Sequence, residues 1–356
     1  MQRDTRESTT SNNGQHNNAD LNAPQNVVDA AALGSVEPVL PTTGITVTAE
    51  PPKKQRPWPD LLQLFTANPR MTIGFCIVGF FVLMALIGPF IARQSPTHFS
   101  NDLFQPPSAT HWLGTTQKGE DIFAQLVYGA RISLLISFVA ATGATMLSIF
   151  FGLTAGYFGG VVDDVLSFLT NMFLILPGLP LSVVIASFSP IKGATTIIFV
   201  LLVTSWPWGA RVLRSQTLSM RQREFVEAAR TVGESPWRII FFEIFPNEIA
   251  IVASSFVGTF VYAALTEVAL EFLGLGDVTV PTWGVILFWA KAENALEIGG
   301  WWLFAPPGLC VAILCAGLTF INFGIDELAN PRLRREAKPK TIRARRSAIY
   351  PIPTHS

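Results

Sequence analysis

The ionisable residues with the clearest functional potential lie in two places in the second half of this chain. One is a polar-rich stretch from Arg221 to Asn247, and the other is a pair of glutamates, Glu267 and Glu271, inside an apolar run. The two glutamates are four residues apart, so on a helix they share one face. Carboxylates at membrane depth are costly and normally face the interior of a helix bundle or a water-filled path. The pair therefore predicts a polar site inside a membrane-embedded bundle.

Two roles for this pair stay open. In the first, both side chains line the outer part of a translocation path, where they touch the substrate or the gate. In the second, Glu267 holds neighbouring helices together through hydrogen bonds, while Glu271 already reaches the water at the membrane interface. Both roles are compatible with a position near the outer end of an apolar run.

The stretch from Arg221 to Asn247 has the pattern of two short helices joined at a glycine. Its first part is rich in helix-forming residues, and Gly233 breaks that pattern. A new start follows, with Ser235 as a possible N-cap and Pro236 at the first helical position. Pro246 is expected to close the second helix before the next apolar run. The stretch predicts a compact element outside the bilayer, with a shape that another protein can grip.

Patterns typical of nucleotide-binding or catalytic chemistry are missing from the sequence. Gly114 and Gly119 have the spacing of the phosphate-binding pattern GxxxxGK[ST], but Glu120 stands where lysine is required. There is no HExxH, and no set of nucleophile, base and orienting group is recognisable. The 3 cysteines lie in apolar runs and the 4 histidines are scattered, which argues against a disulfide or metal framework. An ATP-driven process would therefore need a partner that hydrolyses ATP.

The composition favours a membrane protein. Only 14% of the 356 residues are charged, 49% are hydrophobic, and 27 are phenylalanine, which is too apolar for a soluble chain of this length. The formal net charge of +0 is uninformative because the charges are segregated along the chain. The polar start of the chain has no aromatic residue and predicts a disordered tail, whereas the end of the chain is strongly basic.

Six apolar runs reach or approach the roughly 17 to 25 residues that a helix needs to cross a bilayer. They are Met71–Ile91, Ile132–Tyr157, Val165–Phe188, Ala194–Ala210, Ile249–Leu275 and Trp301–Phe323. Pro177 and Pro180 interrupt the third run. A kink there would line a cavity, because the carbonyls that it frees need protein or water partners. We predict an all-α membrane protein with six transmembrane helices.

Two shorter segments are predicted to lie along the membrane surface. Asp121–Tyr128 has the pattern of a short amphipathic helix. Pro281–Ala290 is apolar but too short to span the bilayer, and we assign it to the outer interface with Trp283 and Trp289 as anchors.

Six spans place both termini on one side, and the positive-inside rule makes that side the cytoplasm. Basic residues gather near both termini and in the polar stretch from Arg221 to Asn247, whereas the opposite loops hold few. The turn Gly159–Asp164 gives no support, since it holds two aspartates and no lysine or arginine. Its cytoplasmic placement follows from the number of spans alone.

The polar stretch resembles the EAA loop found in the membrane subunits of binding-protein-dependent ABC importers. The residues that match the family pattern are Glu227, Ala228, Ala229 and Gly233, followed by Ile244, Phe245 and Pro246. Phe245 stands where the family usually has leucine. Other stretches resemble the second membrane subunit of the dipeptide, oligopeptide and nickel permease branch. These stretches are His111–Leu134, Gly152–Gly160, Glu267–Gly276 and Asn330–Arg334.

This resemblance implies the transmembrane domain of a type I ABC importer. Its EAA loop would dock in a groove on an ATPase subunit and convert nucleotide-driven closure into movement of the spans. Glu227 has Arg223 and Arg230 within helical reach, so it would either stiffen the loop or pair with the partner. The two alanines would allow close approach, and the glycine would permit a turn that a side chain would obstruct. In the fifth span, Glu267 matches the family and Glu271 replaces a small residue.

The resemblance also implies partners. These are a second homologous permease subunit forming a heterodimer, two ATPase subunits or domains that bind ATP and Mg, and an external solute-binding protein. The chain itself would bind no cofactor and no nucleic acid, and would lie in a prokaryotic cytoplasmic membrane with both termini inside. The expected cargo is di- or oligopeptides, with oligosaccharides or a nickel chelate as the alternative. A nucleotide-independent secondary transporter or channel is disfavoured because the spans outside the fifth are nearly free of charge.

With this resemblance, the chain is expected to divide into four parts. They are a disordered cytoplasmic tail (1–57), the first transmembrane helix with an external loop (58–131), a permease core with five transmembrane helices and the EAA loop (132–335), and a basic cytoplasmic tail (336–356).

Overall fold

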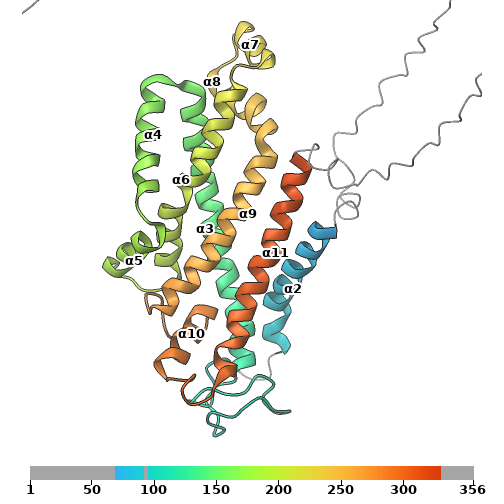
Figure 1. Cartoon of the computed structure of the whole chain (residues 1–356), viewed down its shortest axis with the longest axis vertical. Helices are drawn as coiled ribbons and strands as arrows, with labels where there is room; N and C mark the ends of the chain where they lie inside the picture. The colour runs from blue at the N-terminus through green and yellow to red at the C-terminus, as the bar shows by residue number, and fades with distance from the viewer. Residues whose placement is uncertain (1–68, 92–94, 330–356) are drawn as a thin grey trace, which may run out of the picture. The chain divides into compact units, whose positions relative to one another are not determined.

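The computed structural model describes residues 69–91 and 95–329. The predictions for the two tails, the basic residues within them and Asn330–Arg334 lie outside these residues. The described part is helical, and its only β-type pairing is an isolated bridge between Thr115 and Asp121. Its helices, shown in Figure 1, are α2 (Pro69–Ile91), α3 (Ile122–Phe158), α4 (Gly160–Ile175), α5 (Gly178–Phe188), α6 (Ala194–Met220), α7 (Glu224–Thr231), α8 (Pro236–Arg238), η1 (Ile239–Ile244), α9 (Phe245–Phe272), α10 (Trp283–Ala292), η2 (Trp301–Leu303) and α11 (Ala305–Ala329).

The prediction of six spans is confirmed, with the third span broken. Five continuous segments of the described chain are long and apolar enough to cross a membrane: Pro69–Gly88, Ile122–Phe158, Ala194–Met220, Pro236–Phe272 and Trp301–Glu327. Helices α4 and α5 pass the same test together, but are bent by 90° at the break between them. The backbone is extended at Leu176 and Pro177. The proline ring disfavours helical backbone in the residue before it, which explains the position of the break.

The most extensive helix contact is between α3 and α6, which run side by side in Figure 1. Two glycines on α3 permit it. A Cβ on Gly156 would lie 2.6 Å from the Thr217 Cβ, and one on Gly152 would lie 2.8 Å from the Ala210 carbonyl oxygen. Small residues four apart let the backbones of membrane helices approach closely. The α3–α6 pair thus forms the centre against which α9 packs.

The predicted surface helix Asp121–Tyr128 is wrong, because these residues begin α3. Asp121 is the N-cap of that helix, and its carboxylate accepts a hydrogen bond from the Ala124 N–H at 2.9 Å. The apolar face of this first part is buried within the chain, with Ile122 and Ala130 both 0% exposed. Its amphipathic pattern therefore reports packing against the protein and not against a membrane surface.

The polar stretch is not a pair of short helices. Its first helix is α7, but the second continues from Pro236 through the π-helical segment η1 into α9, forming one 37-residue segment that ends at Phe272. Pro246 lies in the first turn of α9 and does not end the helix. A proline is tolerated there because the wider turn of η1 precedes it, in which the Phe245 N–H bonds the Ile240 carbonyl.

Helix α10 packs into the protein through a tryptophan. The Trp283 side chain is 1% exposed, its Nε1 donates to the Leu126 carbonyl at 3.0 Å, and its ring meets Phe81 edge-on. Its predicted role as an interface anchor is therefore wrong, since both its apolar body and its N–H group are satisfied inside the protein. Trp289 is half-buried, and the Lys118 ammonium lies 3.4 Å from the centre of its ring.

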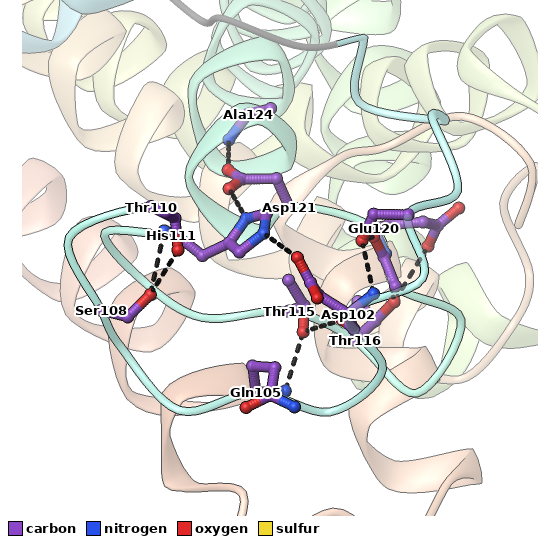
Figure 2. A network of polar contacts seen from close by, with 12 residues as sticks. Asp102, Gln105, Ser108, Thr110, His111, Thr115, Thr116, Glu120, Asp121 and Ala124 are labelled. Atoms are coloured by element: carbon purple, nitrogen blue, oxygen red, sulfur yellow. Dashed lines mark hydrogen bonds and ion pairs between the residues drawn. The ribbon is translucent and has the colours of Figure 1, made fainter.

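The segment between α2 and α3 is held by a polar network around His111 (Figure 2). The imidazole Nδ1 lies 2.8 Å from an Asp121 carboxylate oxygen, and Nε2 lies 3.3 Å from one of Asp102. The hydrogen bond with Asp121 raises the pKa of His111 above its ordinary value, Asp102 adds to this rise, and burial opposes it. Both ring nitrogens face carboxylates, so only the protonated imidazole donates to both.

This network is expected to loosen at alkaline pH. The pKa of His111 is raised in the folded protein, so its stabilising effect is complete below the unfolded value of about 6.5 and is lost as the pH rises through the folded value. Limited proteolysis of residues 95–121 should become faster between about pH 6 and about pH 9, after correction for the protease's own pH profile. His111→Gln should remove this dependence, whereas His98→Gln, at an exposed histidine of the same segment, should retain it. Identical profiles for the two variants would contradict the prediction.

Candidate functional site

Helix α7 lies at the end of the bundle away from α10 (Figure 1) and is attached by one face. Val226 is 0% exposed and packs in a cluster with Leu153 and Ile240. The Arg230 guanidinium carbon lies 5.1 Å from the centre of the Tyr157 ring, close enough for a cation–π contact. Residues on the other face of α7 are exposed. The buried Val226, the partly buried Ala229 and the ring contact of Arg230 therefore fix α7 to α3 and η1.

Gly233 connects α7 to the next helix through a left-handed backbone conformation, with φ +87°. The Gly233 N–H bonds the Arg230 carbonyl at 3.0 Å, and the Glu234 N–H bonds the Ala229 carbonyl at 3.1 Å, a common way to close a helix. A Cβ on Gly233 would meet no atom within 4 Å. The prediction that this turn needs glycine therefore agrees with its backbone conformation, in which any side chain is strained even though none would collide with a neighbour. Ser235 occupies the predicted N-cap position, but its side chain makes no capping bond.

A groove of about 490 Å³ lies between α7 and the end of α3, with Glu227, Arg230 and Arg221 in its wall. Among the described residues, the ion pairs include none between Glu227 and either Arg223 or Arg230. Arg221 instead donates to the Tyr157 carbonyl at 3.3 Å. Of the two roles expected for Glu227, the pairing that would stiffen the loop is not formed here, which leaves its exposed carboxylate available to a partner.

The segment that follows Gly233 leads to an open cavity of about 660 Å³, which is lined by residues of α4, α5, α6, α9 and α11. Helix α9 contributes a large part of the wall, through Ala250, Ile251, Ser254, Ser255, Gly258, Thr259 and Tyr262. Facing it on α11 are Asn322 and Asp326, whose Oδ1 atoms each lie 2.7 Å from Ser254 Oγ. Apolar walls with a few convergent polar groups are typical of a site that holds a small organic solute.

The break in the third span lies at this cavity. Leu176 and Gly178, the residues on either side of Pro177, both line it. The predicted kink is therefore present and placed as expected. That Pro177 itself contributes to a translocation path stays a prediction.

Glu267 and Glu271 lie elsewhere, at the other end of α9, and neither lines the cavity. Their side chains are buried, 1% and 3% exposed. Glu271 accepts a hydrogen bond from the hydroxyl of Thr282, the N-cap of α10, whose oxygen accepts from the Val285 N–H at 3.2 Å. Glu271 thus joins α9 to the start of α10 and does not reach interfacial water. Contact of either glutamate with substrate or gate stays a prediction.

Three polar contacts within the bundle were not predicted from the sequence. The Arg214 guanidinium of α6 binds both carboxylate oxygens of Asp163 on α4, with Nη2 2.7 Å from Oδ2. Glu248 of α9 is 0% exposed and accepts from Thr217 of α6 at 3.1 Å. The third contact joins Asp326 to Ser254 at the cavity. The one sequence signal is an acidic residue close to one end of the third, fifth and sixth apolar runs, namely Asp163, Glu248 and Asp326.

The chain is similar to known membrane transport proteins. The family model described as binding-protein-dependent transport system inner membrane component matches residues 148–335. The model described as the N-terminal TM domain of oligopeptide transport permease C matches residues 56–107. A similar solved structure is an inward-facing MetNI methionine ABC transporter, at 17% identity and a TM-score of 0.46 over 58% of this chain and 94% of that one.

Curated relatives match over most of both chains. The dipeptide transport system permease protein DppC of Alkalihalophilus pseudofirmus is 33% identical over 80% of this chain and 94% of its own length. The oligopeptide transport system permease protein OppC of Bacillus subtilis is 31% identical over 78% and 90%. DppC of the same organism is 34% identical over 78% and 86%. The family model covers more than half of the chain, and the third to sixth spans line a cavity with a few convergent polar groups, so the chain belongs to the inner membrane components of binding-protein-dependent transport systems.

Proposed function

We propose that this chain is the membrane-spanning subunit of an ATP-driven importer that carries di- or oligopeptides. The cargo is supported by the relatives, which are named as dipeptide and oligopeptide permease proteins. The mechanism is supported by one observation: the continuous segment Pro236–Phe272 starts beside α7 and forms much of the cavity wall. A partner that moves α7 would therefore also move the wall of the cavity.

Helix α7 is the element through which an ATPase subunit would act. The residues proposed to carry this coupling are Arg223, Glu227, Ala228, Ala229, Arg230 and Gly233. The exposed face with Glu227 and Ala228 would dock in the partner, and the inward face, through Val226, would pass the movement to η1 and α9. Tightly packed elements shift between discrete arrangements and do not deform continuously, so a small displacement of α7 can change which end of the cavity is open.

The proposed assembly contains a second homologous permease subunit, two ATPase subunits or domains and an external solute-binding protein. ATP and Mg would bind to the ATPase partners, and this chain would contribute no catalytic group. The proposed orientation has both termini and α7 in the cytoplasm of a prokaryotic cell. The arginines in and beside α7, Arg221, Arg223, Arg230 and Arg238, support it, because cytoplasmic loops carry an excess of lysine and arginine.

The proposal is tested by reconstituting the chain with its cognate partners in proteoliposomes. Uptake of a labelled tripeptide should require ATP, the ATPase subunits and the solute-binding protein, and omission of any one should abolish it. Parallel assays with an oligosaccharide and a nickel chelate test the other cargoes. Uptake that continues without the ATPase subunits would overturn the proposed mechanism, and uptake of only a non-peptide solute would overturn the cargo.

A further inference from the structure

Among the described residues, the cavity is lined by one charged side chain, which is acidic. Asp326 is the one acidic residue among its lining residues, which include no lysine, arginine or histidine. The last turn of α11 has no basic residue either. The arginines of α6 nearest in sequence to the cavity, Arg211 and Arg214, line a different and smaller pocket, and Arg214 is already paired with Asp163. The described part of the cavity wall therefore presents a negative charge.

One oxygen of Asp326 is held in place and the other is not. Ser254 has one hydroxyl proton but lies 2.7 Å from both Asp326 Oδ1 and Asn322 Oδ1. The oxygen and nitrogen of an asparagine amide can exchange places by a half-turn of the side chain. With the amide turned, Asn322 donates to Ser254 and Ser254 donates to Asp326, so each group has a partner. No described residue donates to Asp326 Oδ2, and the carboxylate is held with this oxygen unpaired at an exposed position.

We propose that Asp326 receives a positively charged group of the transported solute, so that this path favours cationic over anionic peptides. The inference rests on the proposed peptide import. A carboxylate with one oxygen unpaired, in a cavity whose described lining residues include no cation, attracts ammonium and guanidinium groups and repels carboxylates. Ser254 and Asn322 also hold the Asp326 carboxylate in one orientation, which reduces the entropy lost when the solute binds.

The test compares three tripeptides that differ only in a central lysine, glutamine or glutamate and that the same binding protein delivers at saturation. Maximal uptake rates are measured in the reconstituted importer. For each variant, the rate for the lysine peptide is divided by the rate for the glutamate peptide, so differences in the amount of assembled transporter cancel. Asp326→Asn should lower this ratio by about threefold to tenfold, and Asp326→Lys should lower it further. Glu327→Gln is the matched control, since Glu327 carries the same charge on the same helix but does not line the cavity.

A ratio that changes no more in Asp326→Asn than in Glu327→Gln would overturn the role of Asp326 and leave peptide import intact. Equal uptake rates for the three peptides in the unmodified importer would overturn that role in the same way. Failure of the unmodified importer to carry any peptide counts against the proposed function itself, so the two proposals fail by different results.

Discussion

Replacing Gly156 with leucine is expected to destabilise the protein so strongly that most of it no longer folds. The leucine Cβ alone would lie 2.6 Å from the Thr217 Cβ and 2.9 Å from the Arg214 carbonyl oxygen, so α3 and α6 would have to separate. The same Thr217 donates to the fully buried Glu248. Overpacking and the loss of a buried carboxylate's partner together cost about 3 kcal/mol or more, a large part of the stability of a typical domain.

The matched control is Gly79→Leu in α2, where a Cβ would meet no atom within 4 Å. Both substitutions add the same apolar side chain to a membrane helix and improve its helix propensity. The yield of monodisperse protein after detergent extraction and the midpoint of thermal unfolding should fall sharply for the Gly156 variant and change little for the Gly79 variant. A similar yield and a similar unfolding midpoint for the two variants would show that α3 and α6 are not tightly packed at Gly156.

The positions of the spans could be predicted because a bilayer leaves little choice: a helix that crosses it must be apolar over its whole length. The ends of the helices could not be predicted in this way. A helix can extend beyond its apolar run wherever other parts of the chain bury its additional turns. Helix α3 starts at Ile122 instead of Ile132, since its first turns are buried beneath the 95–121 segment and α10. The sequence also places Trp283 at the membrane interface, whereas its side chain is bound inside the protein. Hydropathy does not distinguish a lipid environment from the interior of a protein.

The polar contacts between helices were harder to predict. The last span was expected to end at Phe323, which placed Asp326 outside it; in the structure α11 continues to Ala329 and brings this residue to the cavity. Asp163 and Arg214 lie 51 residues apart, and only the packing of α4 on α6 reveals that they pair. The EAA-like loop could be identified because its signal lies within one continuous stretch of sequence.

Replacing Gly233 with valine is expected to uncouple ATP hydrolysis from uptake. Valine at φ +87° costs on the order of 1 to 3 kcal/mol. The left-handed turn at Gly233 sets the direction of α7 relative to the helix that starts at Pro236, so a backbone change that relieves this strain turns α7. The exposed face of α7 would then no longer present Glu227 and Ala228 in their native direction. Peptide uptake in proteoliposomes should fall by at least about tenfold, and the loaded binding protein should no longer stimulate ATPase activity.

Gly299→Val separates coupling from stability. Gly299 has φ +82° and equally open surroundings, but it lies between α10 and η2, at the other end of the bundle. Valine there introduces the same strain without reorienting α7. We therefore expect both variants to lose a similar amount of thermal stability and only the Gly233 variant to lose coupled uptake. Equal loss of uptake in both would mean that the strain acts through stability alone. Full uptake by the Gly233 variant would mean that the orientation of α7 does not control the cavity.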